Sequence, residues 1–169
     1  YMKVQLNAIT EYQDKQCGLF AKYSASSSTD EYARRSQFNK DKIVKDIYNG
    51  KKAEFLVYNF LISQERKLNS PDLNIYGKHN KSYDSDLILV NIKIHVKSHE
   101  VNHKFPVSWV FQKTDPLLKI EENNYLALVV LNKDTNYMYL KEIAEVHFRP
   151  PVKQQLRKTK LCLYESDIQ

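Results

Sequence analysis

The stretch that decides the fold is "YDSDLILVNIKIHVKSH", which runs from Tyr83 to His99. An apolar run with acidic residues at its front is followed by a second run in which apolar and polar side chains alternate. Alternation with a period of two is typical of a strand that buries one face. We therefore expect two strands, at residues 86–90 and 92–98, joined by a chain reversal at residues 90 and 91.

This hairpin would bring reactive groups together at one end of a sheet. Asp86 is expected opposite His95 and Val96 and close to Lys97, while the apolar residues of the second strand face the core. A carboxylate is a preferred ligand of Mg²⁺, and a bound metal lowers the pKa of its water. A nearby lysine can orient that water and offset negative charge, and the Val96 carbonyl can supply another oxygen. The grouping suits phosphodiester cleavage, although the acidic residues could also simply cap a turn.

A long helix is predicted before the hairpin. From residue 39 to about residue 67, apolar side chains recur at spacings of three and four, which is typical of a helix with one buried face. The segment "GKKAEFLVYNFL", residues 50–61, places Glu54 among apolar side chains. Glu54 is either an exposed helix charge or a functional carboxylate, and its surroundings favour the second interpretation.

Taken together, these segments resemble the PD-(D/E)XK nuclease superfamily. The resemblance rests on three features. An acidic residue opens the hairpin, and its second strand ends in "HVKS". In the upstream helix, a glutamate follows a glycine by four residues. The resemblance covers about residues 39–131. It implies an α/β restriction-endonuclease-like core, a central mixed sheet flanked by helices, and a Mg²⁺ or Mn²⁺ cofactor. It also implies metal binding by Asp86 and Glu54, a catalytic role for Lys97, and a place near the site for Gln112 in "SWVFQK".

One position departs from the family pattern. His95 stands where the family has its second acidic residue, so one negative ligand is missing unless Glu54 or Asp84 compensates. His95 could bind metal, carry a proton or hydrogen-bond the phosphate. Its presence could also mean that catalysis is lost. The sequence therefore leaves two functions on this fold: an active endonuclease and a degenerate nucleic-acid-binding module.

The rest of the chain predicts one α/β or α+β domain over residues 1–169. Strands are expected at residues 107–112, 125–131 and 137–140, with Trp109 and Phe111 in the core. Residues 1–37 are expected to form an N-terminal extension that packs on the core, with a loop at residues 24–31. A short strand is expected at residues 73–76, and the basic segment at residues 141–169 is expected to begin as a helix.

The net charge of +6 is concentrated in two stretches. Residues 34–52 hold seven basic and two acidic residues, and residues 149–160 hold five basic residues and no acidic one. Such clusters attract polyanions, most often nucleic acid. The residues predicted to contact nucleic acid are Arg34, Arg35, Lys42, Lys51, Lys52, Arg149, Lys153, Arg157, Lys158 and Lys160.

Several other functions have little support in the sequence. The longest apolar run, at residues 125–131, is far too short to span a membrane. His95, His99 and His103 recur every four residues, but in a strand neighbours at that spacing lie about 13 Å apart, too far to share zinc. Cys17 and Cys162 have no partner at a metal or redox spacing, which favours ordinary thiols in a reducing compartment.

The sequence therefore predicts a metal-dependent endonuclease that cleaves DNA, in restriction, phage–host conflict or repair. The expected location is the cytoplasm of a bacterial or phage-infected cell, because a composition rich in Tyr, Asn, Lys and Ile suits an AT-rich genome. DNA is the expected partner, with no membrane association, and a homodimer is an open alternative. Because phosphate-directed basic residues do not distinguish the sugar, an RNA-directed nuclease also stays open.

Overall fold

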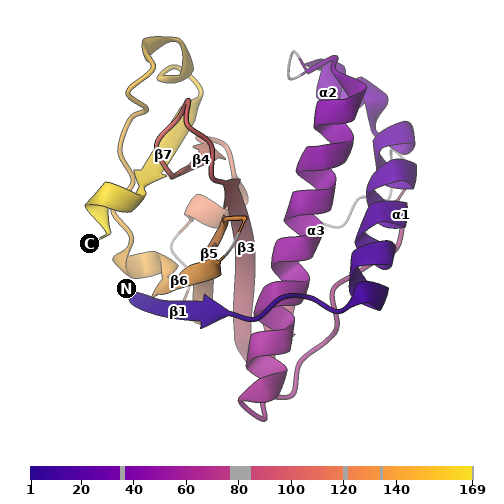
Figure 1. Ribbon diagram of the computed structural model, residues 1–169. Helices are drawn as coiled ribbons and strands as arrows, with labels where there is room; N and C mark the ends of the chain where they lie inside the picture. The colour runs from indigo at the N-terminus through magenta and orange to yellow at the C-terminus, as the bar shows by residue number, and fades with distance from the viewer. Residues whose placement is uncertain (35–36, 77–84, 120–121, 134, 169) are drawn as a thin grey trace.

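The computed structural model describes residues 1–34, 37–76, 85–119, 122–133 and 135–168. These residues form an α/β fold with a mixed five-stranded sheet flanked by helices (Figure 1). None of the helices in these segments is both long and apolar enough to cross a membrane. The helices are α1 (Glu11–Ser27), α2 (Thr29–Arg34) and α3 (Lys40–Ser63). The strands are β1 (Met2–Leu6), β2 (Leu87–Leu89), β3 (Ile92–Glu100), β4 (Ser108–Gln112), β5 (Asn124–Leu131), β6 (Asn136–Glu142) and β7 (Lys160–Tyr164).

The main sheet has the strand order β1-β6-β5-β3-β2. β3 and β5 run parallel, whereas the other neighbouring pairs are antiparallel, so the prediction of a central mixed sheet is confirmed. β5 lies in the middle of the sheet and is buried at nearly every position, which explains why its sequence is continuously apolar. β4 and β7 form a separate two-stranded sheet.

The predicted hairpin is confirmed. β2 pairs with β3 so that Leu87 lies opposite Ile94, and the chain reverses at residues 90 and 91. Val90 has a φ of 46°, in the left-handed region that a two-residue hairpin turn requires and that β-branched residues rarely adopt. Ile94 belongs to the core under α3, with Val96 packed against it, so the expected alternation of faces is correct.

Helix α3 covers one face of the sheet. Asn39 caps its first turn by accepting a hydrogen bond from the amide of Lys42. Its apolar side packs on the sheet through Ala53, Leu56 and Val57. The helix ends at Ser63, before the predicted limit near residue 67, because Glu65 takes up a left-handed φ of 58° and helical geometry cannot continue through it.

The other face of the sheet is covered by the β4–β7 pair. Trp109 and Phe111 are 2% and 1% exposed and pack on Leu126 and Leu128 of β5, so their predicted place in the core is confirmed. The indole nitrogen of Trp109 donates to the carbonyl of Val129, 3.3 Å away. The sheet therefore lies between a helical layer and a second, smaller β layer.

The N-terminal prediction needs one correction. β1 is an edge strand of the main sheet, paired with β6, and α1 packs along α3. The loop predicted at residues 24–31 is wrong, because α1 continues to Ser27 and α2 begins at Thr29. Ser26 and Ser27 donate their hydroxyls to carbonyls of the preceding turn, which lets serine remain in a helix.

Two further predictions of local structure are wrong. No strand forms at residues 73–76, because Asp72 accepts a hydrogen bond from the amide of Asn74 and turns the chain. No α-helix begins at Lys141, because β6 extends to Glu142 and only a short 3-10 turn follows. Later in the same segment, Lys160–Tyr164 form strand β7.

Candidate functional site

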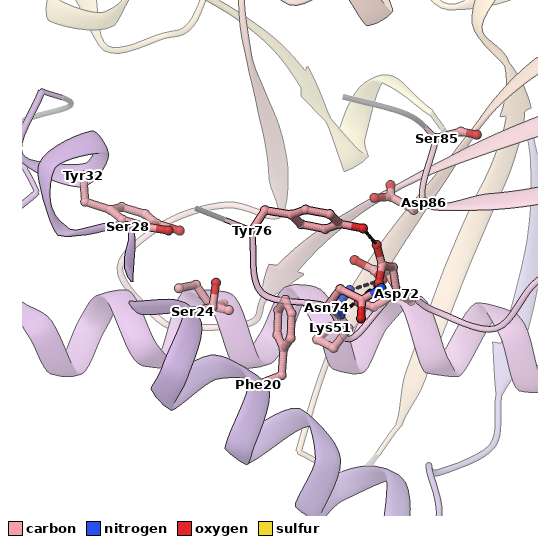
Figure 2. A pocket seen from close by; sticks show the side chains of 12 residues that line it. Phe20, Ser24, Ser28, Tyr32, Lys51, Asp72, Asn74, Tyr76, Ser85 and Asp86 are labelled. Carbon is pink, nitrogen blue, oxygen red and sulfur yellow. Dashed lines mark hydrogen bonds and ion pairs between the residues drawn. The ribbon is translucent and has the colours of Figure 1, made fainter. Parts of the chain in front are cut away.

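An open pocket of about 270 Å³ lies at the open end of the β2–β3 hairpin (Figure 2). Segments far apart in the sequence build it: α1, α2, α3, the loop around residue 74 and the start of β2. Two of its lining residues, Glu54 and Asp86, are the predicted metal ligands. The structure therefore brings these two carboxylates to one pocket.

Asp86 is held in place by the second strand of the hairpin. Its Oδ2 accepts a hydrogen bond of 2.6 Å from the backbone amide of Val96. In a strand, the N–H and C=O of one residue point to the same neighbour, so the Val96 carbonyl faces the same edge of β3 as Asp86. The predicted juxtaposition of Asp86 with the Val96 backbone is therefore present.

Glu54 projects from α3 and is largely buried. Its side chain is 14% exposed, and its Oε2 accepts a hydrogen bond of 2.6 Å from the ammonium of Lys51, one turn earlier. Burial raises the pKa of Glu54 to about 7, while Lys51 lowers it and Asp86 raises it further. Glu54 is therefore a carboxyl group that changes its charge near neutral pH.

Lys51 connects three parts of this pocket. Besides Glu54, its ammonium donates to the backbone carbonyl of Asp72 at 2.5 Å and lies 4.5 Å from the ring centre of Phe20. Only 7% of the residue is exposed. Lys51 is thus wrongly placed among the surface cations predicted to contact nucleic acid, because its charge is already committed to buried partners.

The raised pKa of Glu54 predicts an unusual pH dependence of stability. The unfolded chain loses this proton near pH 4.5, whereas the folded chain keeps it to about pH 7. Since the folded state binds more protons in this window, the free energy of unfolding should fall as pH rises from 5 to 8, by an amount on the order of 3 kcal/mol. Urea denaturation at several pH values measures this slope.

The matched control is Glu54→Gln, which keeps the size of the side chain but does not titrate. The difference in unfolding free energy between wild type and Glu54→Gln should change between pH 5 and 8, because other titrating groups cancel in it. A difference that stays constant over this range would contradict the pKa of about 7.

Lys97 and His95 lie on the sheet face opposite α3. Their partners across the ladder, Leu128 and Leu126, belong to the core on the β4–β7 side. The ammonium of Lys97 lies 5.8 Å from the ring centre of Phe111. Asp86 precedes the first residue of β2, accepts the hydrogen bond from the Val96 amide and lines the pocket beside Glu54 of α3. Lys97 and His95 do not line the Glu54 pocket itself.

His95 is held by a contact that the sequence does not suggest. Its Nε2 lies 2.9 Å from the side-chain oxygen of Asn124, a residue that is only 8% exposed at the start of β5. This contact fixes the orientation of the His95 ring. Asn124 is therefore a positioning residue that the sequence interpretation missed, since nothing in its local pattern separates it from a turn residue.

Gln112 is less closely associated with the pocket. It pairs with Lys160 in the β4–β7 sheet and, by alternation, faces away from the side of β4 that carries Phe111. It does not line the pocket. Gln112 therefore lies on β4, one residue after Phe111, whose ring faces the ammonium of Lys97.

The predicted basic residues divide between two regions. Arg34 and Lys42 are exposed on α2 and α3, and Lys52 of α3 is partly buried. Arg35 and Asp84 lie outside the described residues. Arg149, Lys153, Arg157 and Lys158 are exposed around β7, where Arg149 pairs with Asp167 at 2.7 Å. In Figure 1, α2 and the segment before β7 lie at the same end of the molecule, on opposite sides of β3.

The sequence did not predict that Asp72 and Tyr76 belong to the pocket. The Tyr76 hydroxyl donates to the Asp72 carboxylate, and Figure 2 shows this pair next to Asp86. Their loop carries no periodic pattern, so only its contact with Lys51 reveals its place. The spacing of three residues between Lys51 and Glu54 could have indicated the ion pair on a helix.

The oxygen donors present suit Mg²⁺. That ion uses one or two carboxylates and keeps several waters, and Glu54, Asp86 and the Val96 carbonyl would provide such a set. Within the described segments, no group of three or more His, Cys, Asp or Glu side chains is arranged to hold a metal ion. The site therefore fits a sparsely liganded Mg²⁺ or Mn²⁺ rather than a fully enclosed metal centre.

The resemblance to PD-(D/E)XK nucleases rests on the residues themselves. No protein-family model, no curated protein and no solved structure matches this chain.

Proposed function

We propose that the protein is a Mg²⁺-dependent endonuclease that hydrolyses phosphodiester bonds in DNA and has a restriction-endonuclease-like core. The observation that carries the proposal is the position of Asp86, whose carboxylate is tied to the Val96 amide in the same pocket as Glu54. Two strands and a helix, separate in sequence, thus present oxygen ligands at one edge of the sheet. Phosphate chemistry with a hard cation needs this kind of site.

Each residue has a distinct role in the proposed reaction. Asp86, Glu54 and the Val96 carbonyl would hold the cation, which when bound polarises the phosphate and makes a water acidic. Lys97 follows Val96, whose amide binds Asp86, and its flexible side chain would reach around the edge of β3 toward the phosphate. There its charge would offset the negative charge that develops during hydrolysis.

His95 has a supporting role in this proposal. Its contact with Asn124 leaves the other ring nitrogen, Nδ1, to donate to or accept from a group at the edge of β3. A neutral imidazole adds no negative charge to the site, so the cation is held more weakly than by a second carboxylate. We infer that Glu54, rather than residue 95, supplies the second charge.

The basic surfaces would bind the DNA backbone. Arg34 belongs to α2 and Lys42 to the start of α3, while Lys153, Arg157 and Lys158 belong to the segment before β7. In Figure 1, α2 and the segment before β7 lie at the same end of the molecule. Contacts to phosphates supply affinity without sequence information and weaken steeply with salt. Such an enzyme would act on DNA in the cytoplasm of a bacterial or phage-infected cell, as a monomer that nicks or as a dimer that cuts both strands.

The direct test of the metal site is the release of protons on Mg²⁺ binding. At pH 7 Glu54 is close to half protonated. Because a carboxylate must lose its proton to bind a cation, titration of Mg²⁺ should release roughly half a proton at pH 7 and almost none at pH 9. Calorimetry in two buffers with different ionisation enthalpies measures this number without any substrate.

Glu54→Gln is again the control for the proton count. It should weaken Mg²⁺ binding and abolish the release of protons together. If wild type binds Mg²⁺ with no proton release at pH 7, Glu54 is not the ligand. If Mg²⁺ does not bind and supercoiled plasmid is not cleaved in Mg²⁺ or Mn²⁺ relative to EDTA, the endonuclease proposal fails.

A second candidate is a catalytically degenerate nucleic-acid-binding module on the same fold. It is favoured by His95 at the second acidic position and by the absence of a three-ligand cluster in the described segments. This module would bind DNA but hold no divalent ion between Glu54 and Asp86. The variant His95→Glu restores a carboxylate and separates the two candidate functions. It should strengthen Mg²⁺ binding in both cases. It should give cleavage only if the other proposed catalytic groups are functional.

A further inference from the structure

We propose that the Glu54 pocket holds an unpaired nucleobase, so that the substrate is a strand with a single-stranded or flipped-out nucleotide next to the cleaved phosphate. This inference rests on the proposed nuclease function and names its substrate class. It is carried by the composition of the pocket wall, most of which has no use in holding a cation. Three aromatic rings, an amide and three serine hydroxyls line the pocket beside the carboxylates.

The aromatic rings come from three separate segments. Phe20 lies on α1, Tyr32 on α2 and Tyr76 on the loop before the hairpin, and Figure 2 shows all three around the same space. Stacking of a base on aromatic rings is the usual way in which proteins bind single strands, because every base has an aromatic face. A pocket dedicated to a cation alone would not need these rings.

Contacts with neighbouring residues hold Phe20 and Tyr76 in place. Lys51 covers one face of Phe20 at 4.5 Å. The Tyr76 hydroxyl bonds to Asp72, whose backbone carbonyl is in turn held by Lys51. Tyr76 is therefore positioned before any ligand arrives, and Tyr32 faces the pocket from α2 on another side. Such pre-organisation lowers the entropic cost of ordering a base.

The polar lining suits the edge of a base. Asn74, Ser24 and Ser28 offer both donors and acceptors within the pocket. The volume, about 270 Å³, is just below the roughly 300 Å³ at which pockets begin to hold drug-sized ligands. A single planar group fits this space, whereas a stacked base pair within a duplex would have to leave its helix to enter.

The position of the pocket links base and phosphate. Glu54 and Asp86 line the same space as the aromatic rings. A nucleotide with its base among the rings would therefore place its own phosphate near the predicted metal ligands. An enzyme that binds a base outside the double helix must first unpair and unstack that base, which costs free energy in duplex DNA. Single strands, bubbles and mismatches are therefore better substrates for it.

The test measures binding to three probes that share one sequence and carry 2-aminopurine: single-stranded DNA, single-stranded RNA and duplex DNA. The protein is Lys97→Ala in Mg²⁺, which removes the proposed catalytic lysine but leaves every pocket residue intact. We expect single strands to bind at least about tenfold more tightly than the duplex and the probe fluorescence to be quenched by stacking. The two single-stranded arms then identify the sugar that the pocket accepts.

Variants of Tyr32 give the decisive comparison. Tyr32→Ala should weaken single-strand binding by roughly fivefold or more and reduce the quenching, since one stacked ring contributes that much. Tyr32→Phe keeps the ring and should bind within about twofold of the parent, as should Tyr12→Ala, which removes a tyrosine that is 72% exposed on α1.

Two results would overturn the inference. If duplex binds as tightly as single strands, or if Tyr32→Ala binds single strands like its parent, the pocket does not hold a base. Plasmid cleavage by wild-type protein would still be intact, so the nuclease proposal would survive that result. If the folded protein binds none of the probes and cleaves no plasmid, both proposals fail together.

Discussion

Lys97→Ala and Asp86→Asn should each lower the rate of Mg²⁺-dependent plasmid cleavage by about 100-fold or more. Asp86→Asn removes the charge that would hold the cation, and Lys97→Ala removes the lysine proposed to offset negative charge. Both losses act on the charged transition state rather than on DNA affinity, so the turnover rate should fall while binding changes little. Single-turnover cleavage of supercoiled plasmid, followed on gels, measures the rate directly.

The structure offers controls for both variants. Asn at position 86 retains an oxygen that can accept the hydrogen bond from Val96, so the hairpin should stay intact. Lys93 lies exposed on the same face of β3 as Lys97 but at the other end of the hairpin. Lys93→Ala should therefore cleave at nearly the wild-type rate. Equal activity of Lys97→Ala and Lys93→Ala would exclude Lys97 from the reaction.

Lys51→Met should destabilise the protein by about 3 kcal/mol at pH 8, because it leaves the Glu54 carboxylate buried without its partner. It also removes the donor to the Asp72 carbonyl, which ties the pocket loop to α3. The loss should be smaller at pH 5, where Glu54 is protonated and no charge is stranded. Urea denaturation of the variant and of wild type at both pH values measures the difference.

The neighbouring residue provides the matched control. Lys52 is less buried than Lys51 and does not line the pocket, so Lys52→Met should change the free energy of unfolding by less than about 0.5 kcal/mol. Adding Glu54→Gln to Lys51→Met should recover part of the stability, since the unpaired charge is then gone. If the double variant is as unstable as the sum of the single ones, Lys51 acts through packing and not through its charge.

Local patterns predicted the elements that carry the proposed metal ligands. The hairpin could be predicted because alternation in the second strand and the reversal at Val90 lie within a few residues of each other. Helix α3 could be predicted from the spacing of its apolar residues, even though Gly50 lies within it. Asp86 and Glu54 were identified because each stands at a specific point of such an element.

Local patterns failed where the outcome depended on contacts across the chain. Serine and alanine at residues 24–28 are compatible with either a loop or a helix, and here helix α1 continues through them. Lys51 looked like one of many surface cations, but its buried place beside Glu54 and Asp72 commits its charge to the interior. Asn124 contacts His95 because β5 pairs in parallel with β3, and this pairing joins distant segments.

By itself, the sequence determined the hairpin and the long helix, because periodicity and turn chemistry act over short distances. The family resemblance predicted the two carboxylates, Asp86 and Glu54, as metal ligands. Only the tertiary structure decided that α1, α2 and the loop at Asp72 close around those carboxylates and supply the aromatic wall. It also decided that Lys51 neutralises Glu54 while burial raises its pKa. The reason is that burial and charge pairing depend on which distant segments meet, and no local pattern encodes that meeting.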